Sequence, residues 1–439
     1  MEQLREKLKG KELISFSIFT MILLFVAAFL SDSPEDIGKG MITIVLSRDT
    51  LITDYFELAC YGAAFFNAAL VLGSAIWMMY RLKMHFTGLT MAVLFINVGF
   101  ALFGKNPLNV MPIIIGTWLY ARVHKAPMSR YIYTALFGSC LSPLVTEMGY
   151  LLPFSYGVNL FLAIAIGIFV GFILPPLAQH TASMHMGYNL LNMGFAAGLL
   201  AFVIVCVLQS HGLTCNSVFI WKEGRPLFLI IGLYGYFLLT VLYGFWLNGK
   251  SLKGMKHLLK HPGRAVADFV MMDGEGLTLI NMGLIGGLSL SYILLIKGDL
   301  SGPVIGTILT AYGFAAFGVH LKNFPPVLLG VYLSTYFSNY SPETPGIQLA
   351  AIFSAGLAPV AGQFGFLAGV LAGMMHASVA MCTSALYGGL NLYNNGFSTG
   401  LVAIVMVPML ESFMKGFQER KHEQKMKRQE KLLQKSAKE

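Results

Sequence analysis

Apolar stretches recur along the whole chain, and they constrain its fold more than any other feature. A helix that crosses a bilayer needs about 20 apolar residues, within a range of about 17–25. Fourteen such stretches lie near residues 13–31, 55–80, 86–104, 107–123, 131–151, 157–175, 194–209, 226–247, 277–297, 302–318, 325–339, 346–362, 363–381 and 396–414. Only 12% of the 439 residues are charged, whereas soluble domains carry about 25%. The sequence therefore predicts an all-α integral membrane protein and excludes a soluble multidomain enzyme, a disordered chain and a secreted disulfide scaffold.

The first apolar stretch follows a charged N-terminus, an arrangement that is also typical of a signal peptide. However, residues 31–36 are polar and acidic, where a signal peptide would have a cleavage site of small residues. We therefore expect a retained first span.

The chain contains an internal duplication. When it is shifted by 214 residues, residues 61–120 fall on residues 275–334 with 15 identities in 60 positions, six of them glycines. Two apolar sequences share Leu or Ala by composition, but not six glycines in register. After short insertions or deletions the shift becomes 216 and then 202, and the matches continue to the last apolar stretch. We expect two copies of one helical bundle.

These matches divide the chain into five parts. They are an N-terminal span with an outer loop (1–53), repeat 1 (54–208), a linker with one span and a basic cytoplasmic loop (209–267), repeat 2 (268–413) and a basic cytoplasmic tail (414–439).

Basic residues predict the orientation of the two repeats, because Lys and Arg in short loops mark the cytoplasmic side of a membrane. With a cytoplasmic N-terminus, the main basic clusters all fall inside: 5–11, 81–85, 122–130, 250–264 and 415–439. Repeat 1 then starts outside and repeat 2 inside. The sequence thus predicts two inverted-topology repeats with broken or re-entrant helices and a site near the midplane. We expect both termini to be cytoplasmic in a bacterial inner membrane, with the tail near anionic lipid.

A polar motif, Asn-x-x-Asn-x-Gly, occurs once in each repeat between two apolar stretches. The copies are Asn189, Asn192 and Gly194, preceded by Thr181, and Asn391, Asn394 and Gly396, preceded by Thr383. Asparagines three residues apart share one helix face, and irregular backbone at membrane depth is buried in protein or lines a watery cavity. We expect these residues to line a path for a small polar solute. The alternative is that the asparagines cap helices and link them.

A carboxylate also falls inside a predicted span. Glu147 follows Pro143, and the matching residues of repeat 2 are Gln363 and Pro359. A charge at the bilayer centre costs roughly 2.5–3.5 kcal/mol on insertion scales, so we expect Glu147, with Gln363, to serve the pathway. We expect the two prolines to break their helices. The alternative for Glu147 is a solvated position at the outer interface.

Other polar residues predict less. Asn67 and Asn281 match across the repeats and either line the same cavity or satisfy polar groups in the packing. His180 and His185 are five residues apart, which does not favour a metal site, and His376 is expected to be a hydrogen-bonded helix residue. We find no nucleotide-binding or metallohydrolase motif, and we expect no cofactor, metal or nucleic-acid partner.

The doubled pattern resembles a bacterial family of multi-pass membrane proteins of unknown function. Separately, residues 389–396 (GLNLYNNG) are similar to the Gly-Leu-x-Gly-Tyr-Asn motif of urea transporters, which are inverted duplications with half-helices around a pore. An extra residue interrupts the motif here, and residues 187–192 (GYNLLN) depart further. This resemblance implies a class of small polar solutes, of which urea is one example.

The sequence therefore predicts a transporter or channel for a small polar solute, with its pathway between the repeats. Assembly as a homo-oligomer is compatible with this function. An intramembrane enzyme acting on a lipid or isoprenoid is the main alternative, with Glu147 and His180, His185 or His376 as acid and base. A non-transporting scaffold or sensor that works through its basic tail is the third.

Overall fold

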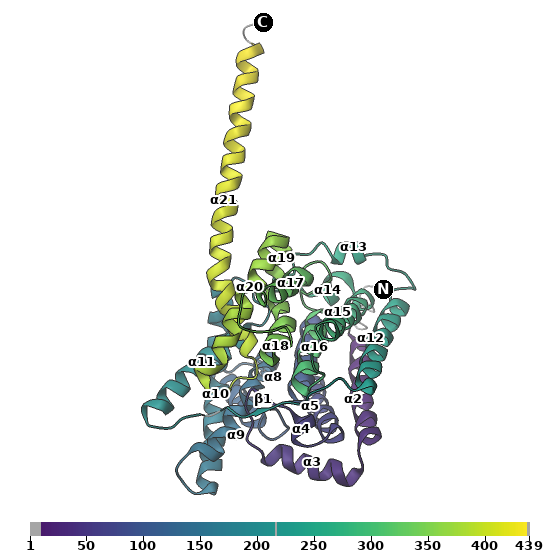
Figure 1. Ribbon diagram of the computed structural model, residues 1–439, viewed down its shortest axis with the longest axis vertical. Coiled ribbons are helices and arrows are strands. Elements are labelled where there is room, and N and C mark those ends of the chain that lie inside the picture. The colour runs from purple at the N-terminus through teal and green to yellow at the C-terminus, as the bar shows by residue number, and fades with distance from the viewer. Residues whose placement is uncertain (1–9, 216, 437–439) are drawn as a thin grey trace.

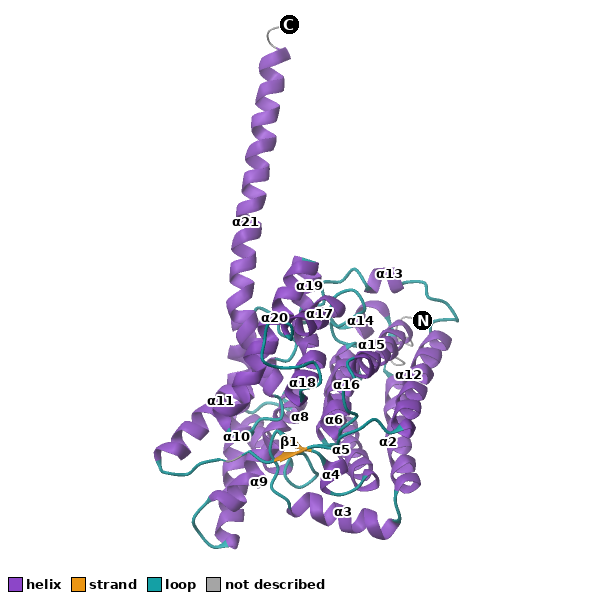
Figure 2. Cartoon of the chain, viewed as in Figure 1, coloured by secondary structure: helices purple, strands orange, loops and turns teal. Residues whose placement is uncertain are grey.

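The computed structural model describes residues 10–215 and 217–436, with side chains described through residue 415 (Figure 1). The described chain is mostly helix, and two short strands, β1 (Ile52–Thr53) and β2 (Phe219–Ile220), pair in parallel (Figure 2). The basic residues within positions 1–9 and the side chains of the tail from 416 onward, which we expected at the cytoplasmic surface, lie outside the described part.

The helices up to α11 and those from α12 onward form two series. The first series is α2 (Lys11–Ser31), α3 (Pro34–Leu46), α4 (Tyr55–Leu58), α5 (Tyr61–Arg81), α6 (Gly88–Phe100), α7 (Met111–Val123), α8 (Ile132–Gly138), α9 (Ser142–Leu151), α10 (Tyr156–Met184) and α11 (Asn192–Ser210). The second is α12 (Leu227–Leu247), α13 (Met255–Leu258), α14 (Phe269–Asp273), α15 (Glu275–Leu295), α16 (Gly302–Phe314), α17 (Phe324–Ser334), α18 (Pro345–Phe353), α19 (Ala358–Phe364), α20 (Phe366–Thr383) and α21 (Asn394–Ser436). Short 3-10 turns, η1 (Met128–Arg130), η2 (Ser139–Leu141), η3 (Ser354–Leu357) and η4 (Ser384–Tyr387), join some of them.

The protein is a multi-pass membrane protein, with fewer full-length spans than apolar stretches. Within residues 10–215 and 217–436, nine helices are long and apolar enough to cross a membrane, and α6, α7, α16 and α17 are apolar but have only 11–13 residues. At 1.5 Å per residue they reach about 17–20 Å, less than the roughly 30 Å of a bilayer core. The expected span at 131–151 is also divided, into α8, η2 and α9. The expectation of fourteen spans therefore counted half-length helices as complete ones.

Backbone turns at matching glycines explain why α6 and α16 end early. Gly104 and Gly318 adopt positive φ angles of 76° and 103°, which favour glycine. The side-chain amide of Asn67 donates to the carbonyls of residues 101 and 105 at 2.7 and 2.8 Å, and Asn281 donates to those of residues 315 and 319 at 2.8 Å each. Asn67 and Asn281 thus satisfy carbonyl groups that the helix break leaves free.

The two series are built alike, element by element. Both ends of α5 and α15 are 214 residues apart, as are both ends of α6 and α16. Lys83 and Lys297, which close α5 and α15, share a left-handed backbone with φ of 54° and 57°. Moreover, α2 packs on α5 as α12 packs on α15, and the hydroxyls of Thr20 and Tyr236 meet at 2.8 Å between α2 and α12.

Equivalent elements lie at opposite ends of the molecule. In Figure 1, α3, α4 and α9 lie at the lower end, which we call the α3 face. Helices α13, α14 and α19 lie at the upper end, from which the long helix α21 extends, and we call this end the tail face. At their crossing, Gly88 of α6 faces Ala316 and Gly302 of α16 faces Leu102. Because the start of each helix meets the end of the other, α6 and α16 run antiparallel.

Each repeat also caps a half-length helix of the other. The Asp54 carboxylate accepts a hydrogen bond from the backbone N–H of Gly302 at 3.0 Å, and Asp268 accepts one from Gly88 at 2.9 Å. A carboxylate at a helix N-terminus satisfies free N–H groups and the helix dipole. The reciprocal pair therefore fixes α6 and α16 side by side at the centre of the bundle.

Candidate functional site

The two Asn-x-x-Asn-x-Gly motifs meet at the centre of the protein. A Cβ added to Gly194 would lie 2.7 Å from Cα of Gly396, and one added to Gly396 would lie 2.8 Å from Cα of Gly194. The amide of Asn189 donates to the Gly396 carbonyl, and that of Asn391 to the Gly194 carbonyl, both at 3.3 Å. The glycines permit close backbone contact between α11 and α21, and the first asparagine of each motif links the two repeats.

The second asparagine of each motif begins its helix and ties it to the helix before. Asn192 Oδ1 accepts from the Thr181 hydroxyl at 2.9 Å and lies 2.8 Å from His185 Nε2. Asn394 Oδ1 accepts from the Thr383 hydroxyl at 2.9 Å and from the Tyr387 hydroxyl. Linking and capping, the alternative that the sequence left open, therefore describe most hydrogen bonds of the four asparagines.

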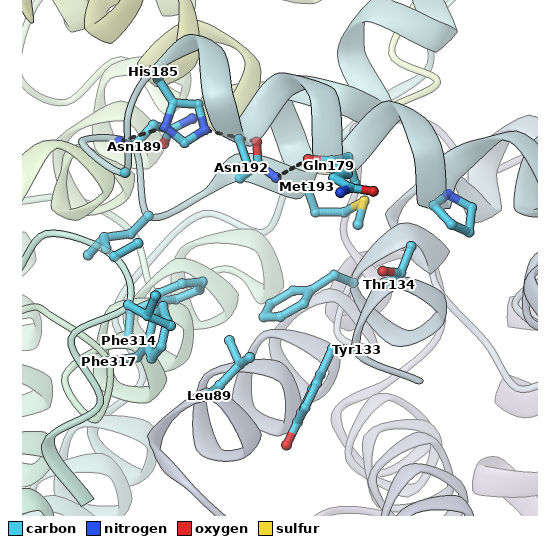
Figure 3. A pocket seen from close by; sticks show the side chains of 18 of the residues that line it. Leu89, Tyr133, Thr134, Gln179, His185, Asn189, Asn192, Met193, Phe314 and Phe317 are labelled. Carbon is cyan, nitrogen blue, oxygen red and sulfur yellow. Dashed lines mark hydrogen bonds between the residues drawn. The ribbon is translucent and has the colours of Figure 1, made fainter. Parts of the chain in front are cut away.

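A cavity of about 720 Å³ lies against the first motif (Figure 3). Its wall runs from loop residues toward the tail face, Arg130, Ala265 and Val266, to Tyr393. Polar lining groups between these ends are Thr134, Gln179, His185, Asn189 and Asn192. In Figure 3, His185 lies between Asn189 and Asn192, with Phe314 and Phe317 apart from them. Among the described residues that line the cavity, Arg130 is the only one with a formally charged side chain.

The lining includes three phenylalanines whose repeat equivalents have a different environment. Phe137, Phe314 and Phe317 line the cavity, and their equivalents are Phe353, Phe100 and Phe103. The Phe100 ring packs on Phe103 at 5.5 Å, on Tyr393 at 5.4 Å and on Phe353 at 6.3 Å between ring centroids. All six rings are buried, so the two sets differ in the space that they border and not in their exposure to solvent. The phenylalanines of one set thus border an open space, whereas their repeat equivalents form a closed cluster with Tyr393.

The structure separates residues that we expected to act together. Asn189 and Asn192 line the cavity, whereas Asn391 and Asn394 are buried and are not among its lining residues. Gln363 is exposed at the end of α19 near the tail face, while Glu147 lies on α9 near the α3 face. The structure thus places Glu147 and Gln363 on equivalent helices near opposite faces of the molecule, and neither is among the residues that line the cavity.

Glu147 has a charged partner that the sequence did not reveal. Its side chain is 0% exposed and forms an ion pair with Arg48, whose Nε lies 3.1 Å from Glu147 Oε2 and whose side chain is 41% exposed. The Glu147 carboxylate is thus buried and paired with Arg48. Pro143 lies in the first turn of α9, and Pro359 in the first turn of α19, each after a 3-10 turn, where a missing N–H is tolerated.

The histidines do not form a catalytic group with Glu147. His180 is exposed, and His376 is buried with Nδ1 3.1 Å from the Ser398 hydroxyl, as a hydrogen-bonded helix residue should be. Only His185 lines the cavity. Among the described residues the hydrogen bonds of Glu147 are to Arg48, so the acid–base pair of the enzyme alternative has no contact here.

Sequence reasoning missed a buried lysine. Lys105 is 0% exposed, and its ammonium donates to Asn97 Oδ1 at 2.8 Å and to the Ser139 hydroxyl at 2.9 Å. It also lies 5.4 Å from the centroid of the Phe100 ring, next to the closed aromatic cluster. The burial of Lys105 could have been predicted from the gap of two residues between the apolar stretches 86–104 and 107–123, because a loop this short does not reach the membrane surface. Its repeat equivalent is Val319.

A second missed group is Asp49, in the loop between α3 and α4. Its buried carboxylate accepts from the Tyr55 hydroxyl at 2.9 Å, from the Asn109 amide at 3.1 Å and from the Thr146 hydroxyl at 3.3 Å. Burial raises the pKa of Asp49 to about 7, although these hydrogen bonds oppose the rise.

Comparison with known proteins places the chain in a family. A family model described as "Protein of unknown function (DUF1576)" matches residues 33–210 and 247–412, so the chain belongs to this family and carries its pattern twice. No curated protein and no solved structure matches the chain. The expected membership of a duplicated family of unknown function is confirmed, and the resemblance to urea transporters gains no support.

Proposed function

We propose that this DUF1576 protein is a transporter for a small polar solute that works by alternating access between two inverted repeats. The observation that carries the proposal is the unequal state of matched aromatic residues. Phe137, Phe314 and Phe317 border a cavity, whereas their equivalents Phe353 and Phe100 pack on Tyr393, and Phe103 packs on Phe100. In an inverted repeat, exchange of the two local arrangements opens the other side of the membrane.

The packing of the repeats supports their inverted topology. Helices α6 and α16 cross antiparallel, and α4 and α14, which are equivalent, lie at opposite ends of the molecule (Figure 1). The loop at 250–264 contains five basic and no acidic residues and lies with α13 at the tail face. Because basic loops remain in the cytoplasm, we assign the tail face to the cytoplasm of a bacterial cell, and with it both termini.

The lining of the cavity favours a neutral or anionic solute. Amide, hydroxyl and imidazole groups come from residues such as Gln179, Thr134 and His185, and no carboxylate lies among the lining residues that the structure describes. A volume of about 720 Å³ lies within the range of about 300–1,000 Å³ common for small-molecule sites. The buried Lys105 amine beyond the aromatic cluster offers a further hydrogen-bond donor on the expected route.

The contact between Gly194 and Gly396 offers a pivot for the exchange. Around it, separation of Phe100 from Tyr393 would open a route toward the α3 face, while Phe314 and Phe317 would close over the cavity. Such rocking of rigid halves is a common transporter motion.

Cysteine accessibility tests the proposal with a matched pair. Thr134 lines the cavity, and its equivalent Ala350 is fully buried. In a cysteine-less background, we expect Thr134→Cys to react with an impermeant charged thiol reagent from the cytoplasmic side and Ala350→Cys to react slowly from either side. Phe100→Ala should expose Ala350→Cys from the outer side. Fast reaction of both cysteines from one side would contradict alternating access.

Transport itself is tested in proteoliposomes. Solutes that raise the unfolding temperature of the purified protein in a screen of small metabolites are loaded outside the vesicles, and their uptake is measured. We expect uptake that Phe100→Ala or an added bulky residue, Ala182→Trp in the cavity wall, reduces. No protein-dependent uptake of any stabilising solute would refute a transport function.

A further inference from the structure

A cluster of metal-ligand groups lies on the tail face, outside the cavity. His257 Nδ1 is 2.7 Å from one carboxylate oxygen of Asp273, and His261 Nε2 is 3.1 Å from the other. The ligand atoms of all three side chains lie within 4.8 Å of one another. The two histidines belong to the linker at α13, and Asp273 ends α14 of repeat 2.

We propose that His257, His261 and Asp273 bind a divalent transition-metal ion of the Zn²⁺ class. Two imidazoles and one carboxylate are a common ligand set for such ions, with water in the remaining positions. Ligand atoms around tetrahedral Zn²⁺ are about 3.3 Å apart, given bonds of about 2.0–2.1 Å. The present separations need only small side-chain rotations to reach that value.

The backbone and burial of the three residues favour a defined site. The spacing of four residues places both histidines on one side of the helical turn that continues past α13, where residues 259–261 donate to the carbonyls of residues 255, 257 and 258. The Asp273 side chain is only 3% exposed, and the His261 carbonyl lies 2.8 Å from His320 Nε2. His257 is exposed, so one side stays open for ion entry and for water ligands.

The ligand set also predicts selectivity. Mg²⁺ and Ca²⁺ need mainly oxygen ligands, and the cluster has one carboxylate among the basic residues of the linker, which include Lys256 and Lys260. Imidazole nitrogen therefore has to supply most of the affinity, which favours Zn²⁺ and Ni²⁺. The ion would replace protons on the two imidazoles, so its binding should weaken at acidic pH.

The position of the cluster suggests a regulatory effect, and this part rests on the proposed function. Three residues after His261, Arg264 Nε donates to the Met186 carbonyl at 2.6 Å, and its guanidinium lies 4.6 Å from the Tyr188 ring centroid. The next two residues, Ala265 and Val266, line the cavity. A metal ion that fastens the linker to α14 would hold the loop beside the cavity in place.

Titration of the purified full-length protein with Zn²⁺ tests the site. The protein is prepared without a polyhistidine tag, and Zn²⁺ affinity is measured by competition with a chromophoric chelator. We expect one site that His257→Ala with His261→Ala weakens at least 100-fold, whereas His211→Ala, an exposed histidine of the same chain, leaves it unchanged. Mg²⁺ should not compete.

Two results would overturn the site: no stoichiometric Zn²⁺ binding by the natural protein, or equal binding by the double variant. Because His257 is exposed, His257→Ala alone should fold normally and should weaken binding at least 10-fold, which keeps the test valid if the double variant fails to fold. The titration measures no transport, so its outcome is independent of the proposed function. The regulatory effect is tested by the labelling rate of Thr134→Cys, which Zn²⁺ should slow, and an unchanged rate would refute it.

Discussion

The contact between Gly194 and Gly396 gives the sharpest prediction for stability. In Gly194→Ala the new methyl group would lie 2.7 Å from Gly396 Cα, 2.7 Å from the Tyr393 carbonyl oxygen and 2.8 Å from Tyr393 Cγ. Unstrained carbon contacts are about 3.5–4.0 Å, so α11 and α21 would have to separate by about 1 Å. Two of the three neighbouring atoms belong to backbone, and none is the free end of a flexible side chain.

Such overpacking costs about 1–3 kcal/mol, and the better helix propensity of alanine offsets about 1 kcal/mol of it. We therefore expect Gly194→Ala to lower stability by up to about 2 kcal/mol, which for a chain of 439 residues is a decrease in unfolding temperature of up to about 2 °C. The matched control is Gly287→Ala in the interior of α15, where an added Cβ meets no atom within 4 Å. Gly287→Ala should unfold at the unfolding temperature of the natural protein or slightly above it.

The assay is thermal unfolding of the detergent-solubilised protein in a background where the other four cysteines are replaced, so that a fluorescent thiol dye reacts only when the buried Cys140 becomes accessible. Gly396→Ala should lower the unfolding temperature as much as Gly194→Ala, and the double variant should lose less than the sum, because both changes force the same helices apart. Equal unfolding temperatures for Gly194→Ala and Gly287→Ala would refute the close contact between the motifs.

Three further predictions concern charged groups. Burial raises the pKa of Asp49 to about 7, well above about 3.9 in an unfolded chain, so between these pH values the folded state holds a proton that the unfolded state has lost. Stability should therefore fall as pH rises from about 4 to 7. Asp49→Asn should remove this fall in unfolding temperature, and an unchanged pH profile would contradict the assignment. Arg48→Ala should destabilise the protein by about 3–5 kcal/mol because it leaves the Glu147 charge buried without a partner. Glu147→Gln should cost less because Arg48 reaches solvent, and Lys39→Ala, which removes an exposed ion pair, should cost under about 1 kcal/mol. These costs are measured by urea unfolding, and the opposite order would show that Glu147 is solvated. Lys105→Met replaces a buried charge by an apolar side chain, so its unfolding temperature should equal or exceed that of the natural protein. Uptake of the stabilising solute should fall at least tenfold, and full uptake would show that Lys105 is not part of the pathway.

The duplication was predicted from glycines at matching positions in the two halves of the chain. Glycine occupies these positions because two backbones meet there or the backbone turns. Gly104 and Gly318 close matching half-length helices, and Gly88 and Gly302 begin them. The sequence also located both Asn-x-x-Asn-x-Gly segments between helices. Local pattern carried these predictions, because each depends on residues close together in the chain.

The partners of polar residues could not be predicted in the same way. Glu147 pairs with Arg48, 99 residues away, and Asn189 bonds to Gly396, 207 residues away. Hydropathy alone made the half-length helices look like full spans. It does not show where a helix ends and the Asn67 amide binds the carbonyl groups that the break leaves free. Lys105 was missed because a single lysine between two apolar stretches reads as an exposed loop residue, whereas here the fold buries it.

The central claim is that the two repeats are inverted across the membrane, and labelling of two equivalent loop residues tests it most directly. Lys83 and Lys297 are both exposed and share the same left-handed backbone. In a cysteine-less background, Lys83→Cys and Lys297→Cys are treated with an impermeant maleimide on intact cells and on inverted vesicles. We expect Lys297→Cys to react on intact cells and Lys83→Cys only on inverted vesicles; reaction of both from one side would contradict the inverted architecture.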